Sequence, residues 1–271
     1  MLTRAAVKKF RNTIYTYYHL HTRRLPWRQT RNPYCILVSE IMLQQTQVNR
    51  VLEKYTQFLK RFPTLTSLAE AKLGDVYAVW QGLGYNRRAK FLRDLAWVLV
   101  SEYKGRLPKT QAELLTLPGI GPATAAALQA FVFNQPALYL ETNVRSVYLH
   151  HFFKDKVSVP DSALLPVIEQ TMDKSNPRKW NYALLDYGVY IKQTFKNPSR
   201  RSLHHIKQSK FVGSLRQVRG GVLKQLVQAP ASAKELSGLL RFEVERVEAA
   251  LHALQAEKMI IKKGRRYFLA L

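Results

Sequence analysis

The sequence predicts an all-α protein whose only β-structure lies in its last residues. Apolar residues recur at the spacing of an amphipathic helix in segment after segment, and no stretch before about the last ten residues alternates as a strand does. The chain has 271 residues and is 46% hydrophobic, which is enough to fill one large domain or two. The composition therefore excludes a disordered tail.

The first expected helix, residues 4–19, is amphipathic rather than uniformly apolar. It lacks the apolar run and the cleavage site of a secretory signal, so we expect a cytoplasmic, nucleoid-associated protein. The same spacing predicts further helices at 33–46, 48–61, 66–70, 73–79, 86–103, 110–115, 122–132, 142–151, 161–173, 178–191, 214–227, 231–239 and 243–256.

The charge of the chain indicates a polyanionic partner. Lys and Arg number 43 against 18 acidic residues, a formal net charge of +25. Nucleic acid is the leading interpretation, and a generally basic or ribosome-associated protein is the alternative that charge alone leaves open. An anionic membrane is less favoured, because no long uncharged apolar stretch is present.

Cysteine content limits the possible cofactors. Cys35 is the only cysteine, which excludes an intramolecular disulfide, a four-thiolate iron–sulfur cluster and a cysteine-based zinc site. Because its neighbours are apolar, we expect a buried structural thiol. We therefore expect no metal and no cofactor.

The C-terminal third divides into a linker and a small domain. Residues 192–220 contain no acidic side chain, so we interpret 196–213 as a basic linker whose Arg200, Arg201, Lys207 and Lys210 contact phosphate. Residues 214–271 combine three short helical patterns with two β-like runs, as in a winged helix. A purely structural or protein-binding role for this domain is an equally good interpretation.

A glycine-rich turn precedes the helix expected at 122–132. The stretch LPGIGPAT places Gly119 and Gly121 before Pro122, a residue favoured at the first helical position. Such a hairpin presents backbone N–H groups at a helix N-terminus, where they can bind a DNA phosphate.

Further motifs surround this hairpin in a fixed order. LPWR begins at residue 25, SEIMLQQTQV at residue 39, WQGLGY at residue 80 and ETNVR at residue 141. Over about residues 5–190 the chain closely resembles MutY-type adenine DNA glycosylases of the helix-hairpin-helix (HhH-GPD) superfamily, which are endonuclease III-like. The resemblance implies a two-lobed glycosylase core over 1–195, with a six-helix barrel at about 30–140 and a second lobe from 1–29 and 141–195. It also implies a duplex DNA partner with a damaged or mispaired base, which is flipped out of the stack.

The resemblance assigns catalytic roles to Glu40, Glu141 and Asn143. Glu40 stands among apolar residues, where desolvation raises a carboxyl pKa and suits it to protonate a purine at N7. Glu141 takes the place of an aspartate that stabilises the cationic sugar, and capping of the next helix is the alternative role. Asn143 matches an asparagine that holds the site water or the carboxylates. The extra methylene of Glu141 leaves open an altered or lost activity.

The resemblance also assigns DNA contacts. Gln45 and Tyr85 match residues that wedge into the base stack, and Leu83 supports them. Arg28, Arg87 and Arg88 are candidate phosphate or strand contacts, with a solvated surface as the alternative. Asp186 is expected to be structural. Bifunctional relatives place a Schiff-base lysine where this chain has Ala123, so no lysine-dependent lyase step is expected.

The expected activity is removal of adenine from 8-oxoguanine:A or G:A mispairs by a monomeric, monofunctional glycosylase. The chain lacks the family's cluster cysteines, and a winged-helix-like segment takes the place of its 8-oxoguanine-reading domain. A glycosylase for mismatched thymine or uracil, hypoxanthine or an alkylated purine is one alternative. A lesion-binding protein that has lost catalysis is the other.

Overall fold

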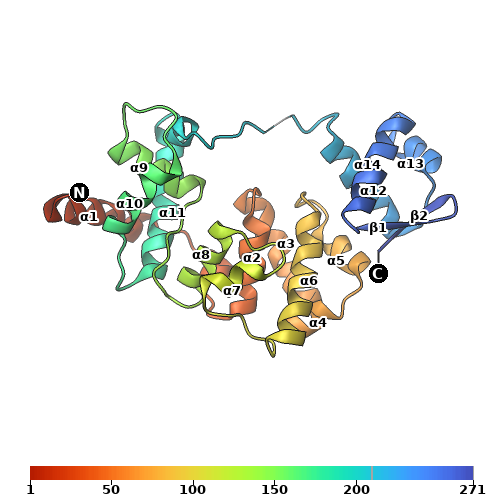
Figure 1. Ribbon diagram of the computed structural model, residues 1–271, viewed down its shortest axis with the longest axis horizontal. Coiled ribbons are helices and arrows are strands. Elements are labelled where there is room, and N and C mark those ends of the chain that lie inside the picture. The colour runs from red at the N-terminus through yellow and green to blue at the C-terminus, as the bar shows by residue number, and fades with distance from the viewer. Residues whose placement is uncertain (209, 271) are drawn as a thin grey trace. The chain divides into compact units, whose positions relative to one another are not determined.

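The computed structural model describes residues 1–208 and 210–270, and nearly all of its regular structure is helical (Figure 1). The helices are α1 (Arg4–His21), α2 (Pro33–Leu43), α3 (Val48–Arg61), α4 (Leu65–Ala69), α5 (Leu73–Trp80), α6 (Arg87–Glu102), α7 (Gln111–Thr116), α8 (Pro122–Phe131), α9 (Thr142–Phe152), α10 (Asp161–Thr171), α11 (Pro177–Thr194), α12 (Leu215–Gln228), α13 (Ala233–Leu240) and α14 (Val244–Ala256). Two 3-10 helices, η1 (Pro26–Arg28) and η2 (Pro198–Arg201), and the strands β1 (Ile260–Lys263) and β2 (Arg266–Leu269) complete the order. The all-α prediction is confirmed.

The chain folds into two compact units. Unit 1 comprises Met1–Ile36, Lys109–Leu115 and Ile120–Lys207, and unit 2 comprises Leu37–Pro108, Thr116–Gly119 and the described residues from Gln208 onward. This division differs from the predicted lobes, because residues 120–140 join unit 1 instead of the segment from 37 to 108. It also places the first part of the predicted linker, residues 196–207, in unit 1.

The core of unit 1 explains why residues 120–140 belong to it. Helix α8 buries Ala126, Ala130 and Phe131 in the cluster formed by α1, α9, α10 and α11. The Phe131 ring stacks on the Tyr182 ring of α11, with centroids 4.4 Å apart. Burial of this apolar face stabilises the packing by about 25 cal/mol per Å² of apolar surface. Residues 120–140 therefore pack in unit 1, although a division based on sequence order groups them with residues 37–108.

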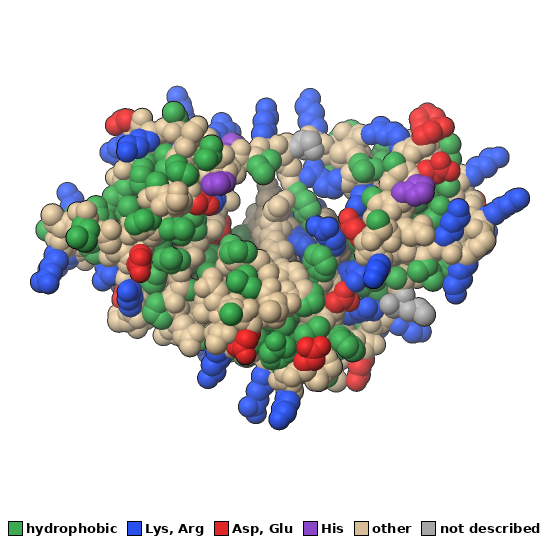
Figure 2. All heavy atoms as spheres, in the orientation of Figure 1, with side chains coloured by type: hydrophobic (Ala, Val, Ile, Leu, Met, Phe, Trp, Pro, Cys, Tyr) green, Lys and Arg blue, Asp and Glu red, His purple; other side chains and the backbone are tan. Residues whose placement is uncertain are grey.

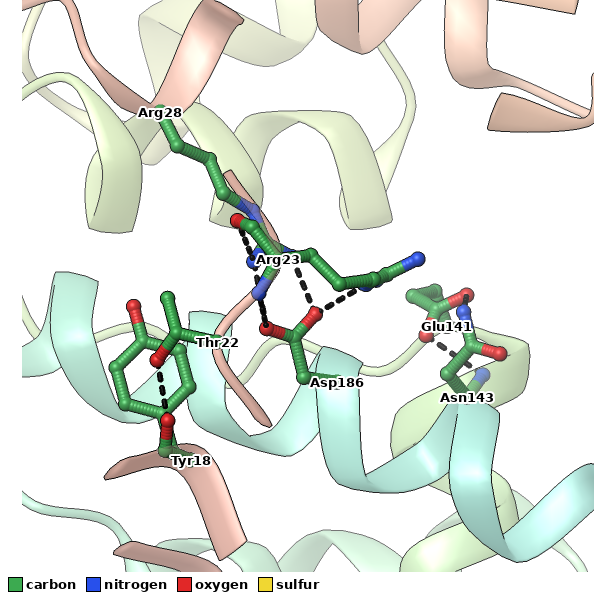
Figure 3. A network of polar contacts seen from close by, with 7 residues as sticks. All are labelled: Tyr18, Thr22, Arg23, Arg28, Glu141, Asn143 and Asp186. Carbon is green, nitrogen blue, oxygen red and sulfur yellow. Dashed lines mark hydrogen bonds and ion pairs between the residues drawn. The ribbon is translucent and has the colours of Figure 1, made fainter. Parts of the chain in front are cut away.

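A buried ion-pair network attaches the segment after α1 to α11 (Figure 3). The Asp186 carboxylate of α11 accepts hydrogen bonds from Arg28 Nη1 at 2.8 Å and Nη2 at 2.9 Å, and from Arg23 Nε at 2.5 Å. The side chains of Asp186 and Arg28 are only 1% and 7% exposed. Asp186 therefore has the expected structural role, whereas the prediction that Arg28 contacts DNA is wrong, since its guanidinium is already paired and lies over the Tyr182 ring.

Helix α9 packs directly on α11 at one glycine. A Cβ on Gly188 would lie 2.4 Å from the Asn143 carbonyl oxygen and 2.7 Å from the Asn143 carbonyl carbon. Only a residue without a side chain lets the two backbones approach this closely. Gly188 therefore sets the position of the first turn of α9.

Unit 2 has a core of its own around α3, α5 and α6. Phe58 and Trp80 are fully buried and meet edge to face, with ring centroids 6.0 Å apart. The predicted helix at 33–46 ends at Leu43, because Gln45 has a left-handed backbone with φ of 55°. A residue in this conformation cannot continue an α-helix.

The C-terminal part of unit 2 has the element order of the predicted winged-helix-like domain. Helices α12, α13 and α14 precede an antiparallel hairpin in which Ile260 pairs with Leu269 and Lys263 with Arg266. A further bridge joins Ala231 to Tyr267. Helix α13 starts with a capping box between Ser232 and Glu235. The two β-like runs expected in this segment form the strands β1 and β2.

Replacing Asp186 by Asn is expected to lower the free energy of unfolding by about 3–5 kcal/mol, because it leaves the buried Arg28 cation without a counter-charge. Urea denaturation of the full chain measures the change. The control is Asp75→Asn, whose exposed pair with Arg61 has an N–O distance of 3.4 Å. That change should stay within about 1 kcal/mol of wild type. Equal effects of the two substitutions would contradict the structural role of Asp186.

Gly188→Ala is expected to destabilise the protein by about 1–3 kcal/mol, because the new methyl group overlaps the Asn143 backbone. Gly220→Ala on α12 is the matched control, since nothing lies within 4 Å of its Cβ position. There the helix propensity of alanine should stabilise by up to about 1 kcal/mol. Thermal denaturation compares the two variants, and a neutral or stabilising Gly188→Ala would show that α9 and α11 tolerate separation.

Candidate active site

Glu141 is the N-cap of α9 in unit 1 (Figure 3). Its Oε1 accepts hydrogen bonds from the backbone N–H of Asn143 at 2.6 Å and of Val144 at 3.0 Å, and Asn143 Nδ2 donates to Oε2 at 3.3 Å. The helix-capping alternative for Glu141 is therefore observed. Capping does not exclude catalysis, because the same contacts hold the carboxylate in one orientation at the positive end of a helix.

Burial raises the pKa of Glu141 above its ordinary value. The N–H groups of Val144 and Asn143 act in the opposite direction, as does the charge of Lys192. Lys192 Nζ of α11 also donates to Asn143 Oδ1 at 3.2 Å. Glu141, Asn143 and Lys192 thus form one polar cluster, and Lys192 is a member that the sequence motifs did not identify.

Glu40 lies near the end of α2 and belongs to unit 2. It is partly buried, and its neighbours Leu37, Val38 and Ile41 are at most 1% exposed. The helix thus carries one carboxylate on an otherwise apolar stretch, as expected from the sequence. Cys35, at the other end of α2, is partly exposed, so the prediction of a buried thiol is wrong.

The prediction that Arg88 contacts DNA is also wrong. The Arg88 residue is 7% exposed, and Nη1 donates to the carbonyl oxygens of Ile41 at 2.8 Å, Met42 at 2.9 Å and Gln44 at 2.6 Å. Burial lowers its pKa to about 10, which still leaves the guanidinium charged at neutral pH. Arg88 caps the end of α2, and it therefore positions Gln45, which is exposed in the turn that follows.

The loop between α5 and α6 carries the other predicted wedge residues. Leu83 is only 2% exposed, so it packs beneath the loop, where its predicted supporting role requires it. It is therefore not available for contact with DNA. Gly84 and Tyr85 have φ values of 73° and 47°. The Tyr85 hydroxyl accepts a hydrogen bond from Arg216 Nη1 at 2.9 Å, a contact from the start of α12 that the sequence motifs did not reveal.

The two glycines of the glycine-rich hairpin have different backbone conformations. Gly119 has φ of 75°, and a Cβ there would lie 2.8 Å from the Phe91 Cβ. Gly121 has ordinary extended dihedrals as the N-cap of α8, and Pro122 occupies the first turn. Gly121 is exposed and has open space around it, which leaves room for a ligand atom at the N-terminus of α8.

The basic residues predicted to contact phosphate divide into exposed and structural ones. Arg87, Arg200, Lys207 and Lys210 are exposed. Arg201 is partly buried and donates to carbonyl oxygens at the end of α9, among them Leu149 at 2.9 Å and Phe153, so the contacts observed for it are structural. On the face shown in Figure 2, Lys and Arg side chains are widely spread and acidic ones are few.

The described residues contain no group of three or more His, Cys, Asp or Glu side chains that could hold a metal ion. The single Cys35 does not fit the four thiolates of an iron–sulfur cluster. None of the described helices is long and apolar enough to cross a membrane.

Comparison with known proteins places these residues in a family. Residues 38–163 match the model of the HhH-GPD superfamily base excision DNA repair protein. Adenine DNA glycosylases from Buchnera aphidicola subsp. Baizongia pistaciae and from Homo sapiens are 36% and 34% identical over 67% and 69% of this chain. The chain spans 52% and 36% of their lengths, about half or less.

Relatives with other names cover more of their own length. A thymine/uracil-DNA glycosylase from Methanothermobacter thermautotrophicus is 29% identical over 68% of this chain and 85% of its own. The solved structure of a thermostable thymine-DNA glycosylase aligns with a TM-score of 0.62 and 27% identity, over 71% of this chain and 90% of that one. The segment that includes residues 38–163 is therefore a domain of the HhH-GPD superfamily of base excision DNA repair proteins, and the chain is similar to adenine DNA glycosylases.

Proposed function

We propose that the chain is a monofunctional DNA glycosylase that releases adenine from 8-oxoguanine:A or G:A mispairs. The observation that carries the proposal is the pair of carboxylates held in defined surroundings, Glu40 on an apolar helix and Glu141 at the N-terminus of α9. Both stand within the motifs by which the chain resembles adenine DNA glycosylases. Asn143 keeps the Glu141 carboxylate oriented through a backbone and a side-chain hydrogen bond.

The two carboxylates have complementary roles in the proposed reaction. Glu40 protonates N7 of the flipped adenine, so that the bond between C1′ of the sugar and N9 breaks with both electrons going to the base. The ionised Glu141 stabilises the cationic sugar until water adds to C1′ and loses a proton. The products are free adenine and an abasic site. No step requires a metal or cofactor.

Exposed and partly exposed residues supply the DNA contacts in this proposal. Gln45 and Tyr85 enter the stack, the N–H groups of the hairpin at Gly119 and Gly121 approach a phosphate, and the exposed cations Arg87, Arg200, Lys207 and Lys210 contact the backbone. Ala123 provides no amine for a Schiff base, so the enzyme stops at the abasic site. One monomer per lesion, in the nucleoid, is the simplest arrangement.

A second candidate function is release of mismatched thymine or uracil. It is favoured by the extent of the match to thymine/uracil-DNA glycosylase, which covers 85% of that protein. Leaving-group chemistry separates the two candidates, because a purine needs protonation at N7 whereas a pyrimidine leaves without it. Loss of Glu40 should therefore abolish purine release and spare pyrimidine release.

Single-turnover base release tests the proposal directly. Duplexes carry A opposite 8-oxoguanine, A opposite G, T opposite G, or U opposite G, and alkali reveals abasic sites. Glu40→Gln should slow adenine release about 10²–10⁴-fold. Glu141→Gln retains a carbonyl oxygen that can cap α9 but loses the charge, and should slow release at least about 10²-fold. Glu102→Gln, on the exposed end of α6, is the matched control.

The possible results discriminate among the hypotheses. Adenine release that is lost in both glutamate variants supports the two-carboxylate mechanism. Release of thymine or uracil alone, unaffected by Glu40→Gln, favours the second candidate. Firm binding without release from any duplex would sink the enzyme hypothesis for these bases and favour a lesion-binding protein.

The pH dependence of single-turnover release should show an acid limb set by Glu141. Its raised pKa means that the carboxylate becomes protonated, and the rate falls, at a higher pH than for an ordinary glutamate. Because the Lys192 charge lowers the Glu141 pKa, Lys192→Gln should move the acid limb to higher pH. Lys179→Gln, at the other end of α11, is the control and should leave the acid limb at the same pH. If Lys192→Gln does not move the acid limb, Glu141 is not the group that causes it.

A further inference from the structure

Unit 1 contains a small basic cavity where η2 packs on the end of α9. The cavity has a volume of about 290 Å³ and is lined by His150, Lys154, Phe195, Lys196, Asn197, Pro198, Arg200 and Arg201. Four of these side chains are Lys or Arg, and no acidic side chain is among the described residues that line it. We propose that this cavity binds a phosphate group of the DNA backbone, an assignment that rests on the proposed function and adds a defined phosphate site to it.

The charge of the cavity is not neutralised within the protein. Lys154, Lys196 and Arg200 are exposed, and their side chains form no hydrogen bond or ion pair within the described part of the chain. Elsewhere in unit 1 comparable cations are paired, as Arg145 is with Asp161 at 2.7 Å. Like charges gathered around one hollow repel one another, and a phosphate among them removes that repulsion.

The walls of the cavity are held rigidly, which favours a defined site over a loose basic tail. Arg201 donates to the carbonyl oxygens of Leu149 and Phe153, so it ties η2 to α9 and neutralises the negative end of that helix. Parallel bridging joins Val159 to Ser202, with the Val159 N–H donating to the Arg201 carbonyl oxygen at 3.0 Å. The hydrogen bonds of Arg201 thus hold together the two segments that form the cavity.

The backbone at the mouth of the cavity adopts an unusual conformation. Lys196 and Asn197 have φ values of 37° and 46°, in the left-handed region that side chains other than glycine rarely occupy. Pro198 follows at once, and Ser199 Oγ donates to Asn197 Oδ1 at 2.7 Å. A strained backbone persists only where the surrounding contacts hold it in place, and such strain is common at ligand-binding sites. Here it turns Lys196 toward the same hollow as Lys154 and Arg200.

His150 is a built-in reporter of an anion in this cavity. Its ring packs on the Phe195 ring, with centroids 4.4 Å apart, and lies 5.0 Å from the His151 ring. Burial lowers the pKa of His150, and the positive charges of Lys154 and Arg201 lower it further. A bound phosphate would favour the imidazolium and raise this pKa.

Salt-dependent binding of an undamaged duplex to the full chain tests the proposal. The variant is Lys154→Gln, Lys196→Gln and Arg200→Gln combined, and the matched control removes the same charge at the exposed residues Lys104, Arg106 and Lys109. One phosphate contact corresponds to a slope of about 0.9 in log K against log salt. Between 50 and 200 mM salt, wild-type affinity should therefore fall about three- to four-fold more than that of the cavity variant. An unchanged slope in the cavity variant, or an equal change in the control, overturns the proposal.

Histidine NMR separates the possible sources of the phosphate, with the His150 signal assigned by His150→Gln. Inorganic phosphate and the undamaged duplex should each raise the pKa of His150 in the full chain, and neither should do so in the cavity variant. A response to inorganic phosphate without a response to duplex would indicate a site for a free phosphate compound and overturn the DNA assignment. No response to either excludes a phosphate site. Since both experiments use undamaged DNA, they remain informative even if base release fails.

Discussion

Helix α11 is the element on which the arrangement of unit 1 depends. Within ten residues, three of its positions contact neighbouring segments: Asp186 binds Arg28, Gly188 admits the backbone of Asn143, and Lys192 reaches the Asn143 side chain. The glycine lets α9 approach closely, and the ion-pair network fixes the segment before α2. The orientation of Glu141 therefore follows from packing at some distance along the chain.

Buried guanidinium groups are a second recurring device. Arg28 pairs with a carboxylate, whereas Arg88 and Arg201 donate to carbonyl oxygens at the ends of α2 and α9. Arginine suits these positions because it supplies several donors in a rigid fork and stays charged. Two of these three arginines thus bind the carboxyl-terminal ends of helices. The remaining exposed cations carry the electrostatic attraction to a polyanion.

Glu141 stands where the family resemblance implies an aspartate. One of its carboxylate oxygens accepts the two N–H groups at the start of α9 and so caps that helix. Its carboxylate lies at the positive helix end, whose N–H groups act against the rise in pKa that burial causes. Helix capping holds the carboxylate in one orientation, and the proposed role toward a cationic sugar uses the same charged group.

The sequence by itself determined the helical class, the positions of the helices to within about three residues and the motifs with Glu40, Glu141, Gln45 and Tyr85. These features are local, because the spacing of apolar residues and the chemistry of caps and turns act over a few residues. Tertiary structure alone decided which basic residues are buried. Arg87 and Arg88 are neighbours in the sequence, yet one is exposed and the other is 7% exposed beneath the end of α2. Whether an arginine is buried depends on carbonyl groups and carboxylates that come together from distant segments. The local sequence pattern therefore does not predict it. The same holds for residues 120–140, for Lys192 beside Asn143 and for the basic cavity, all of which exist only once α8, α9, α11 and η2 have packed.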